Sequence, residues 1–254
     1  MIELLKKDKK SGRVTFVLKG TPAFANALRR AMMESVPSMA VDEVEFVQND
    51  GVLYDEMLAH RLALVPLSTD LKGYDVRKPG DELSAKNSVK LVLKAKGPCT
   101  VYAEDLKSKD PKVKPVFGKI PLTKLLKGQE LEFVATAVLG TGKEHSKFSP
   151  CLAWYSYKAK VTVNNNHKDF EKFKDKYPPQ VFNNGKIDEK LIEQHNLFDA
   201  CDGVNDEIVK VERDPTTFIF HVEPWGQLSP SEILACAADH LTGLFDEFIS
   251  KLEK

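Results

Sequence analysis

A short segment of the sequence brings together three side chains of the kinds that metal-dependent hydrolases use. Asp55, Glu56 and His60 lie in a stretch whose apolar spacing predicts a helix, and His60 follows Glu56 by four residues, on the same helix face. A zinc hydrolase of the H-E-x-x-H type needs two histidines four residues apart around its glutamate. This segment contains only one histidine, so the spacing argues against metal-dependent hydrolysis.

Two other kinds of catalytic motif are absent from the sequence. His145 lies near Gly140 and Gly142, but the string GTGKEHS lacks the G-x-x-x-x-G-K-[ST] spacing of a phosphate-binding loop. No serine or cysteine stands in a G-x-S-x-G nucleophile elbow. A lone histidine in a loop is usually structural, and we expect neither a catalytic residue nor a metal ligand in this chain.

The composition is that of an intracellular protein without an excess of either charge. Lysine plus arginine and aspartate plus glutamate each number 37 among the 254 residues, whereas a protein that grips DNA alone usually carries a basic excess. The four cysteines are scattered without a C-x-x-C pair, as in reduced cytoplasmic proteins; they are Cys99, Cys151, Cys201 and Cys236. No apolar run approaches the roughly 20 residues that span a bilayer, and the charged amino terminus is unlike a signal peptide. We expect a cytoplasmic protein with no membrane contact and no direct sequence-specific binding of nucleic acid.

The segment that begins at Thr21 predicts a helix with an apolar face and a pair of arginines away from it. Thr21 is a favourable N-cap, Pro22 suits the first helical position, and Pro37 disfavours helical geometry at Val36. The apolar stripe consists of Phe24, Ala27, Leu28, Ala31, Met32 and Ser35. The residues off this stripe are Asn26, Arg29, Arg30 and Glu34. Taken alone, this pattern suits an ordinary surface helix with solvated arginines as well as it suits an assembly surface.

The sequence after this helix predicts a strand, a turn and a second helix. The alternating stretch MAVDEVEFV leads to a turn at Asn49-Asp50-Gly51 and then to VLYDEMLAHRLALVPL, which Pro66 closes. This order, with the strings NALRR and DEMLAHRLALVPL, resembles the alpha-type assembly subunits of multisubunit RNA polymerases. Three further strings resemble the archaeal form of that family, the D subunit: KGPCTVYAEDLKSKDPKVKPV, GTGKEHSKFSPCLAWYSYKA and FIFHVEPWGQLSPSEIL.

The last predicted helix has the clearest local signals. Ser229 and Glu232 form a capping box, and Pro230 takes the first helical position. The apolar residues behind it recur at three- and four-residue steps: Leu234, Ala237, Leu241, Leu244, Phe245, Phe248 and Leu252. Such a face ordinarily covers the core of its own domain. The family resemblance implies instead that this helix and the one after Thr21 pack against the equivalent pair of a partner. The residues expected in this pairing are Phe24, Leu28, Met32, Leu234, Leu241, Phe245, Phe248 and Leu252. Arg29 and Arg30, off the apolar stripe, are expected to contact a partner in the next assembly step.

The resemblance also implies an α+β fold with three parts: a discontinuous dimerisation domain, an inserted β-rich domain and a small ferredoxin-like domain. Predicted hairpins lie at residues 2–18 and in QVFNNGKI, where Asn184-Gly185 forms the turn. Further predicted strands are SVKLVLKAKG, PCTVYAEDL, LEFVATAVLG, CLAWYSYKAKVTV and TTFIFHVE. The expected boundaries are 1–48, 148–165 and 214–254 for the dimerisation domain, 49–147 for the insert and 166–213 for the ferredoxin-like domain.

Many archaeal members of this family carry an iron–sulfur cluster in the ferredoxin-like domain, on cysteines spaced C-x2-C-x2-C-x3-C. In that register this chain has Asn196, Asp199, Asp202 and Asp206, and Cys201 is out of register. Carboxylates replace cluster thiolates poorly, so we expect the cluster to be lost and the chain to hold no cofactor. The three aspartates leave two interpretations open: a site for a hard cation such as Ca²⁺ or Mg²⁺, or a solvated loop or helix cap.

We therefore expect a non-catalytic assembly platform of an archaeal DNA-directed RNA polymerase, a nucleotidyltransferase whose active site lies in its largest subunit. The resemblance implies that the chain heterodimerises with the small L subunit. The pair then recruits the small N and P subunits and the second-largest subunit, the last through Arg29 and Arg30. A eukaryotic third-largest subunit is the nearest alternative, and the ferredoxin-spaced remnant argues against it. From a different class, the alternative is a free-standing ferredoxin-like redox or metal-binding protein.

Overall fold

The computed structural model describes residues 2–77 and 80–253, and its mixture of helices and sheets confirms the α+β class. The chain forms two compact units, each assembled from separate stretches of sequence. The smaller unit consists mainly of Tyr155–Phe220, with Val17–Pro22 and the residues before Leu4. The larger unit consists of Leu4–Phe16, Ala23–Trp154 and the residues from His221 onward. The boundaries expected for the three domains stay a prediction.

Four strands supply residues to both units and form one sheet in the order β1-β2-β12-β9. They are β1 (Ile2–Lys7), β2 (Val14–Lys19), β9 (Cys151–Val163) and β12 (Val209–Pro224). The predicted amino-terminal hairpin is confirmed: the Asp8 N–H donates to the Arg13 carbonyl at 2.9 Å, and Gly12 lies in the turn with φ 72°. Because β2 and β12 are neighbours, strands far apart in the sequence share one sheet.

Helix α1 (Pro22–Arg30) begins at the predicted proline and continues as the π-helical segment η1 (Ala31–Ser35). Val36 then leaves the helical region with ψ 121°, as the following proline requires. The buried residues of this helix are Ala25, Leu28, Ala31 and Met32. The buried face therefore differs from the predicted stripe at one end, because Phe24 is 47% exposed and Ala25 is fully buried. Both residues have helical spacing to Leu28, so packing rather than periodicity selects the smaller one.

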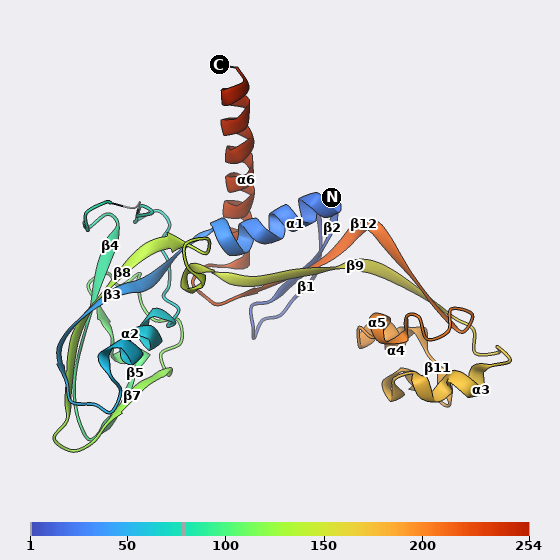
Figure 1. Cartoon of the computed structure of the whole chain (residues 1–254), viewed down its shortest axis with the longest axis horizontal. Coiled ribbons are helices and arrows are strands. Elements are labelled where there is room, and N and C mark those ends of the chain that lie inside the picture. The colour runs from blue at the N-terminus through green and yellow to red at the C-terminus, as the bar shows by residue number, and fades with distance from the viewer. Residues whose placement is uncertain (1, 78–79, 254) are drawn as a thin grey trace. The chain divides into compact units, whose positions relative to one another are not determined.

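The middle of the larger unit contains two antiparallel sheets (Figure 1). The first has the order β3-β8-β4-β6, with β3 (Pro37–Asn49), β4 (Ser88–Lys96), β6 (Lys107–Ser108) and β8 (Glu130–Thr141). The second pairs β5 (Cys99–Tyr102) with β7 (Pro121–Leu125). Leu58 and Leu62 of helix α2 (Asp55–Ala63) share one hydrophobic core with Leu91, Leu122 and Phe133. Every second side chain of a strand points into this core, because successive side chains point to opposite faces of a sheet.

Helix α2 is shorter than the sequence predicted. Tyr54, which precedes it, is extended with φ −63° and ψ 157°. The Asn49 side-chain amide donates to the Leu53 carbonyl at 2.9 Å and to the Asp55 carboxylate at 2.7 Å. These bonds hold residues 50–54 outside the helix, although their apolar spacing suits its periodicity.

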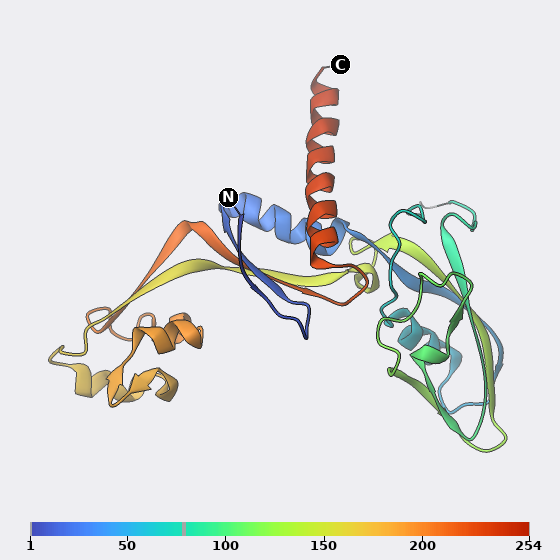
Figure 2. The same cartoon turned by 180° about the vertical axis from the view of Figure 1, so that it is seen from behind.

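The smaller unit has its own apolar core and several short elements, drawn together in Figure 2. These are α3 (Phe170–Phe173), α4 (Glu189–Gln194), α5 (Phe198–Cys201), β10 (Phe182–Asn183) and β11 (Lys186–Ile187). The predicted hairpin turn is confirmed, with φ 50° at Asn184 and 78° at Gly185. Tyr177, Val181 and Ile192 are among its buried residues.

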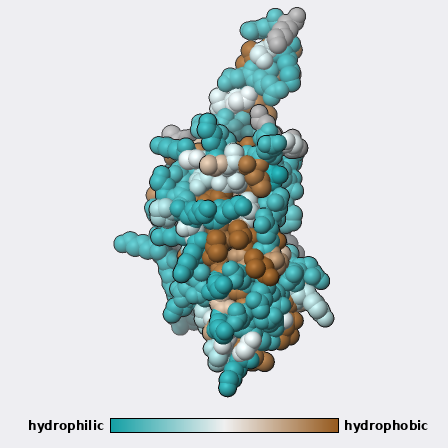
Figure 3. Space-filling view, turned by 90° about the vertical axis from the view of Figure 1, so that its left-hand side faces the viewer, coloured by the Kyte–Doolittle hydropathy of each residue, from teal (hydrophilic) through white to brown (hydrophobic). Residues whose placement is uncertain are grey.

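Apolar surface gathers in the middle of the side of the molecule drawn in Figure 3, within hydrophilic surface. On the β3-β8-β4-β6 sheet, Val92 is 36% exposed and pairs with Val134. Apolar atoms make up much of the surface of any folded protein, so we assign no function to this patch. Within residues 2–77 and 80–253, none of the helices has both the length and the apolar character needed to cross a membrane.

Candidate assembly interface

Helix α6 (Pro230–Leu252) is the longest helix in the described part of the chain. The predicted capping box at its start is confirmed. The Glu232 N–H donates to the Ser229 hydroxyl at 3.3 Å, and the Glu232 carboxylate accepts from the Ser229 N–H at 2.9 Å. Hydrogen bonds from Ser229 lower the pKa of Glu232, so the carboxylate stays charged at the positive end of the helix dipole.

The two halves of α6 differ in burial. Ile233 and Ala237 are buried, and this first half packs against η1. After Leu241 every described residue is exposed. In this second half the large apolar residues form one face, which we call the terminal face: Leu244 at 50% exposure, Phe245 at 66%, Phe248 at 59%, Ile249 at 51% and Leu252 at 70%. No element of the larger unit lies along it in Figures 1 and 2.

Contiguous apolar surface of this kind marks interaction sites on soluble proteins. Leu234 and Leu241 are partly buried by their own chain, whereas Phe245, Phe248 and Leu252 are open. Ile249 also belongs to the face and was missed by the sequence analysis. Its position four residues after Phe245 was a usable signal.

Two residues expected at the partner surface are covered by their own chain. Leu28 is 4% exposed and Met32 is 0% exposed, so neither offers surface to a partner. Met32 belongs to the π-helical segment that α6 covers. The apolar face of the first helix therefore serves the core of its own chain, which corrects the expectation for these two positions. Partner contacts of the remaining positions stay a prediction.

Arg29 and Arg30 lie away from the buried face, as the periodicity predicts, and each is held by a neighbour on the helix. Arg29 donates to the Asn26 side-chain oxygen from Nε at 3.2 Å and from Nη2 at 2.9 Å. Arg30 donates to the two Glu34 carboxylate oxygens at 3.1 and 2.9 Å. This bidentate contact raises the pKa of Arg30 and lowers that of Glu34. The pair presents two oriented guanidinium groups at the surface.

The loop GTGKEHS is structural. A side chain at Gly142 would place its Cβ 2.1 Å from the Met33 carbonyl, and the Lys143 N–H donates to the Glu34 carbonyl at 2.9 Å. His145 Nδ1 accepts from the Lys147 N–H at 3.0 Å, which caps the short helix η3 (Ser146–Phe148). The loop therefore braces η1, and with it the segment that carries the two arginines.

The residues considered for metal hydrolysis do not assemble a site. Asp55, Glu56 and His60 are exposed on α2, and the Asp55 carboxylate accepts from Asn49. Within the ranges 2–77 and 80–253, no three histidine, cysteine or acidic side chains converge as metal ligands.

The residues in the cluster register do not fit an iron–sulfur cluster. Arg213 donates to Asp199 from Nη2 and to Asp202 from Nη1, both at 2.6 Å, and these bonds raise its pKa. Asn196 is an exposed residue with φ 51°. Cys201 is buried in the apolar core, and burial raises the pKa of its thiol. Clusters need thiolate ligands, and here two carboxylates are neutralised by arginine. That the chain holds no cofactor stays a prediction.

A β-rich insert and an exposed helical face are the features that the resemblance to alpha-type RNA polymerase subunits implies. The sequence matches the family described as "RNA polymerase Rpb3/RpoA insert domain" over residues 44–150. It is 39% identical to DNA-directed RNA polymerase subunit Rpo3 of Pyrococcus horikoshii, covering 100% of this chain and 98% of that protein. Identity is 37% to Rpo3 of Thermococcus kodakarensis, over 100% of this chain and 99% of the relative. Identity is 36% to Rpo3 of Natronomonas pharaonis, over 97% of this chain and 95% of that protein. The chain belongs to the archaeal Rpo3 family of DNA-directed RNA polymerase subunits.

Proposed function

We propose that this chain is a non-catalytic assembly platform, the D-type subunit, of an archaeal DNA-directed RNA polymerase. The observation that carries the proposal is the exposed terminal face of α6 in a chain whose relatives are named as polymerase subunits. Obligate interfaces resemble a core cut in half, and the two phenylalanines of this face suit that description. The cytoplasmic location expected from the sequence belongs to the same proposal.

The first partner in this proposal is the small L subunit, which lays its own helices along α6. The first half of α6 already packs on its own chain, so the partner's contacts begin near Leu241 and continue to Leu252. The seven-residue spacing of Leu234, Leu241 and Phe248 supports a helix-against-helix seam. The pair then recruits the small N and P subunits and the second-largest subunit.

Replacing Phe248 tests the heterodimer. Phe248 is 59% exposed, so Phe248→Arg should leave the chain folded. Burying a phenylalanine contributes about 1.5–3 kcal/mol, and an unpaired buried charge adds a further cost. When the chain is co-expressed with L, we expect recovery of the complex to fall more than about tenfold, which corresponds to about 1.4 kcal/mol.

Ser250→Arg is the matched control, because Ser250 is exposed on the opposite side of α6. It should leave the heterodimer intact, and circular dichroism should show equal helix content in both variants. Undiminished copurification of L with Phe248→Arg would contradict the assignment of the terminal face. So would equal loss of L in both variants.

Arg29 and Arg30 are proposed to contact the second-largest subunit. Guanidinium forks suit carboxylates and backbone carbonyls, and truncating such a group in a desolvated interface costs about 2–5 kcal/mol. The double variant Arg29→Glu, Arg30→Glu should still bind L while recovery of the second-largest subunit falls by about thirtyfold or more. Its loss of the exposed Glu34 ion pair matters little for folding, since such pairs contribute about 0–1 kcal/mol.

The double variant Lys9→Glu, Lys10→Glu is the matched control, because it reverses two adjacent exposed cations in the amino-terminal hairpin turn. It should assemble like the unmodified chain. Failure of the arginine variant to bind L, or full assembly of polymerase by that variant, would overturn the assignment.

A further inference from the structure

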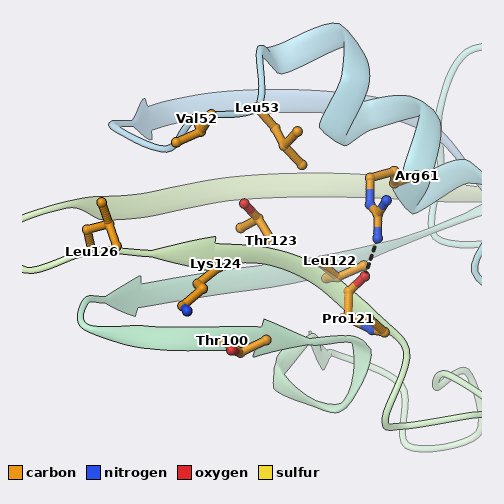
Figure 4. Close-up of a pocket in the computed structure, with 9 residues that line it drawn as sticks. All are labelled: Val52, Leu53, Arg61, Thr100, Pro121, Leu122, Thr123, Lys124 and Leu126. Carbon is orange, nitrogen blue, oxygen red and sulfur yellow. Dashed lines mark hydrogen bonds between the residues drawn. The ribbon is translucent and has the colours of Figure 1, made fainter.

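A hollow of about 460 Å³ lies in the middle of the larger unit (Figure 4). Its walls are the turn before α2, Arg61 of α2, Thr100 of β5, and strand β7 with Leu126 after it. No residue of α1 or α6 lines it, so it is separate from the surfaces assigned above. The volume falls in the range of about 300–1,000 Å³ that is typical of ligand sites.

The rim of this hollow is apolar and open. Val52 is 75% exposed and Leu126 is 55% exposed, and both line it. Tyr54 and Met57, close in sequence to Val52, are also exposed, at 72% and 49%. Clustered apolar side chains at a concave surface are the composition of a docking site rather than of an ordinary solvated face.

One wall of the hollow is the edge of a strand. Within the described residues, β7 pairs with β5 only, so its second edge lacks a ladder partner. Four of the five residues of β7 line the hollow, and the Arg61 guanidinium reaches from α2 to the Pro121 carbonyl at the start of this strand (Figure 4). Unpaired strand edges bind extended polypeptide by adding it as a further strand.

The hollow is also electropositive. Arg61 and Lys124 line it, and in the described part of the chain neither forms an ion pair with a carboxylate. None of its lining residues is acidic. A ligand that complements this wall carries negative charge, because cations at a binding surface favour and orient carboxylates.

We propose that this hollow docks an extended, acidic and aliphatic segment of another polypeptide, which adds to the free edge of β7. Alternate residues of an extended segment point to one side, so one aliphatic side chain packs beside Val52 and Leu126 while a carboxylate two residues away faces Lys124. This surface goes beyond the proposed heterodimer and requires neither the terminal face nor the two arginines.

A fluorescein-labelled peptide tests the proposal with the full-length chain. The peptide has leucine, glutamate and leucine at every second position, with threonine between them. In an extended strand the two leucines and the glutamate therefore lie on one side. Fluorescence anisotropy should show saturable binding. Lys124→Glu should weaken it about tenfold, because an exposed attraction becomes a repulsion. Lys90→Glu, an equal charge change on exposed β4, should leave the affinity within about twofold.

Hydrogen exchange provides a second readout that does not depend on a variant. The peptide should slow amide exchange within residues 121–125, and a peptide with proline at its central positions should neither bind nor protect them. No saturable binding up to millimolar peptide would overturn the proposal. Equal weakening by Lys124→Glu and Lys90→Glu, or protection confined to α6, would also overturn it.

Discussion

A single carboxylate, that of Asp214, lies inside β12 just before the buried part of that strand. Its Oδ1 accepts from the Thr216 N–H at 2.8 Å and from the Thr216 hydroxyl at 2.7 Å. Its Oδ2 accepts from the Thr217 hydroxyl at 2.6 Å. These hydrogen bonds, the one from the Thr217 hydroxyl foremost, hold the pKa of Asp214 at about 2, because all of them favour the charged form.

Asp214 is therefore expected to make stability depend on pH. Its folded pKa of about 2 lies below the ordinary value of 3.8, so its contribution is fully present above pH 3.8 and is lost as the pH falls toward 2. Asp214→Asn should unfold at lower urea than the unmodified chain at pH 6, and the difference should shrink between pH 4 and pH 3. Asp239→Asn, on exposed α6, serves as the control. A difference that stays constant over this range would contradict the prediction.

At the scale of elements, the arginine-bearing segment depends on a close approach between a loop and a helix. Gly142 permits that approach, since a Cβ there would meet the Met33 carbonyl at 2.1 Å. Backbone at this distance cannot move aside like a flexible side chain. The orientation of η1 therefore rests on a residue outside it, far along the sequence.

Two glycine-to-alanine variants separate this packing effect from helix propensity. Gly142→Ala should destabilise the chain by about 1–3 kcal/mol through overpacking. Gly243→Ala should stabilise it by about 0.5–1 kcal/mol, because Gly243 lies inside α6 and a Cβ there meets no atom within 4 Å. Urea unfolding measures both effects. If both variants changed the free energy of unfolding equally and in the same direction, the contact with Met33 would not restrict the loop.

Helix α6 shows how one element can serve two surfaces. Its capped first half lies on its own chain, and its second half is open along an apolar face. The same seven-residue pattern runs through both halves. Periodicity therefore indicated an apolar seam, but the point at which the chain stops covering it near Leu241 is a property of the packed structure.

For the whole molecule, we predict that the chain folds without an iron–sulfur cluster. Protein purified anaerobically should be colourless, because Asp199 and Asp202 pair with Arg213 and the Cys201 thiol lies in the core. Iron and acid-labile sulfide analyses should both fall well below one equivalent per chain. Excess EDTA should leave the thermal unfolding midpoint unchanged, and millimolar Ca²⁺ or Mg²⁺ should not raise it. Visible absorbance with stoichiometric sulfide would contradict the prediction.

The sequence by itself determined the elements whose signals are local. Three local features follow from the conformational preferences of a few neighbouring residues, and all three are confirmed. They are the Ser229 capping box, the turn at Asn184-Gly185 and the end of the helix before Pro37. The family strings likewise needed only residue order, and the relatives confirm the polymerase family.

Only the tertiary structure decided which apolar faces are covered. Periodicity marks Leu28, Met32 and Phe248 alike as apolar, yet the first two are buried in their own chain and the third is open. The hollow beside β7 likewise depends on contacts between segments far apart in sequence. The physical reason is that the hydrophobic effect rewards removal of apolar area from water without specifying what covers it. Long-range packing makes that choice.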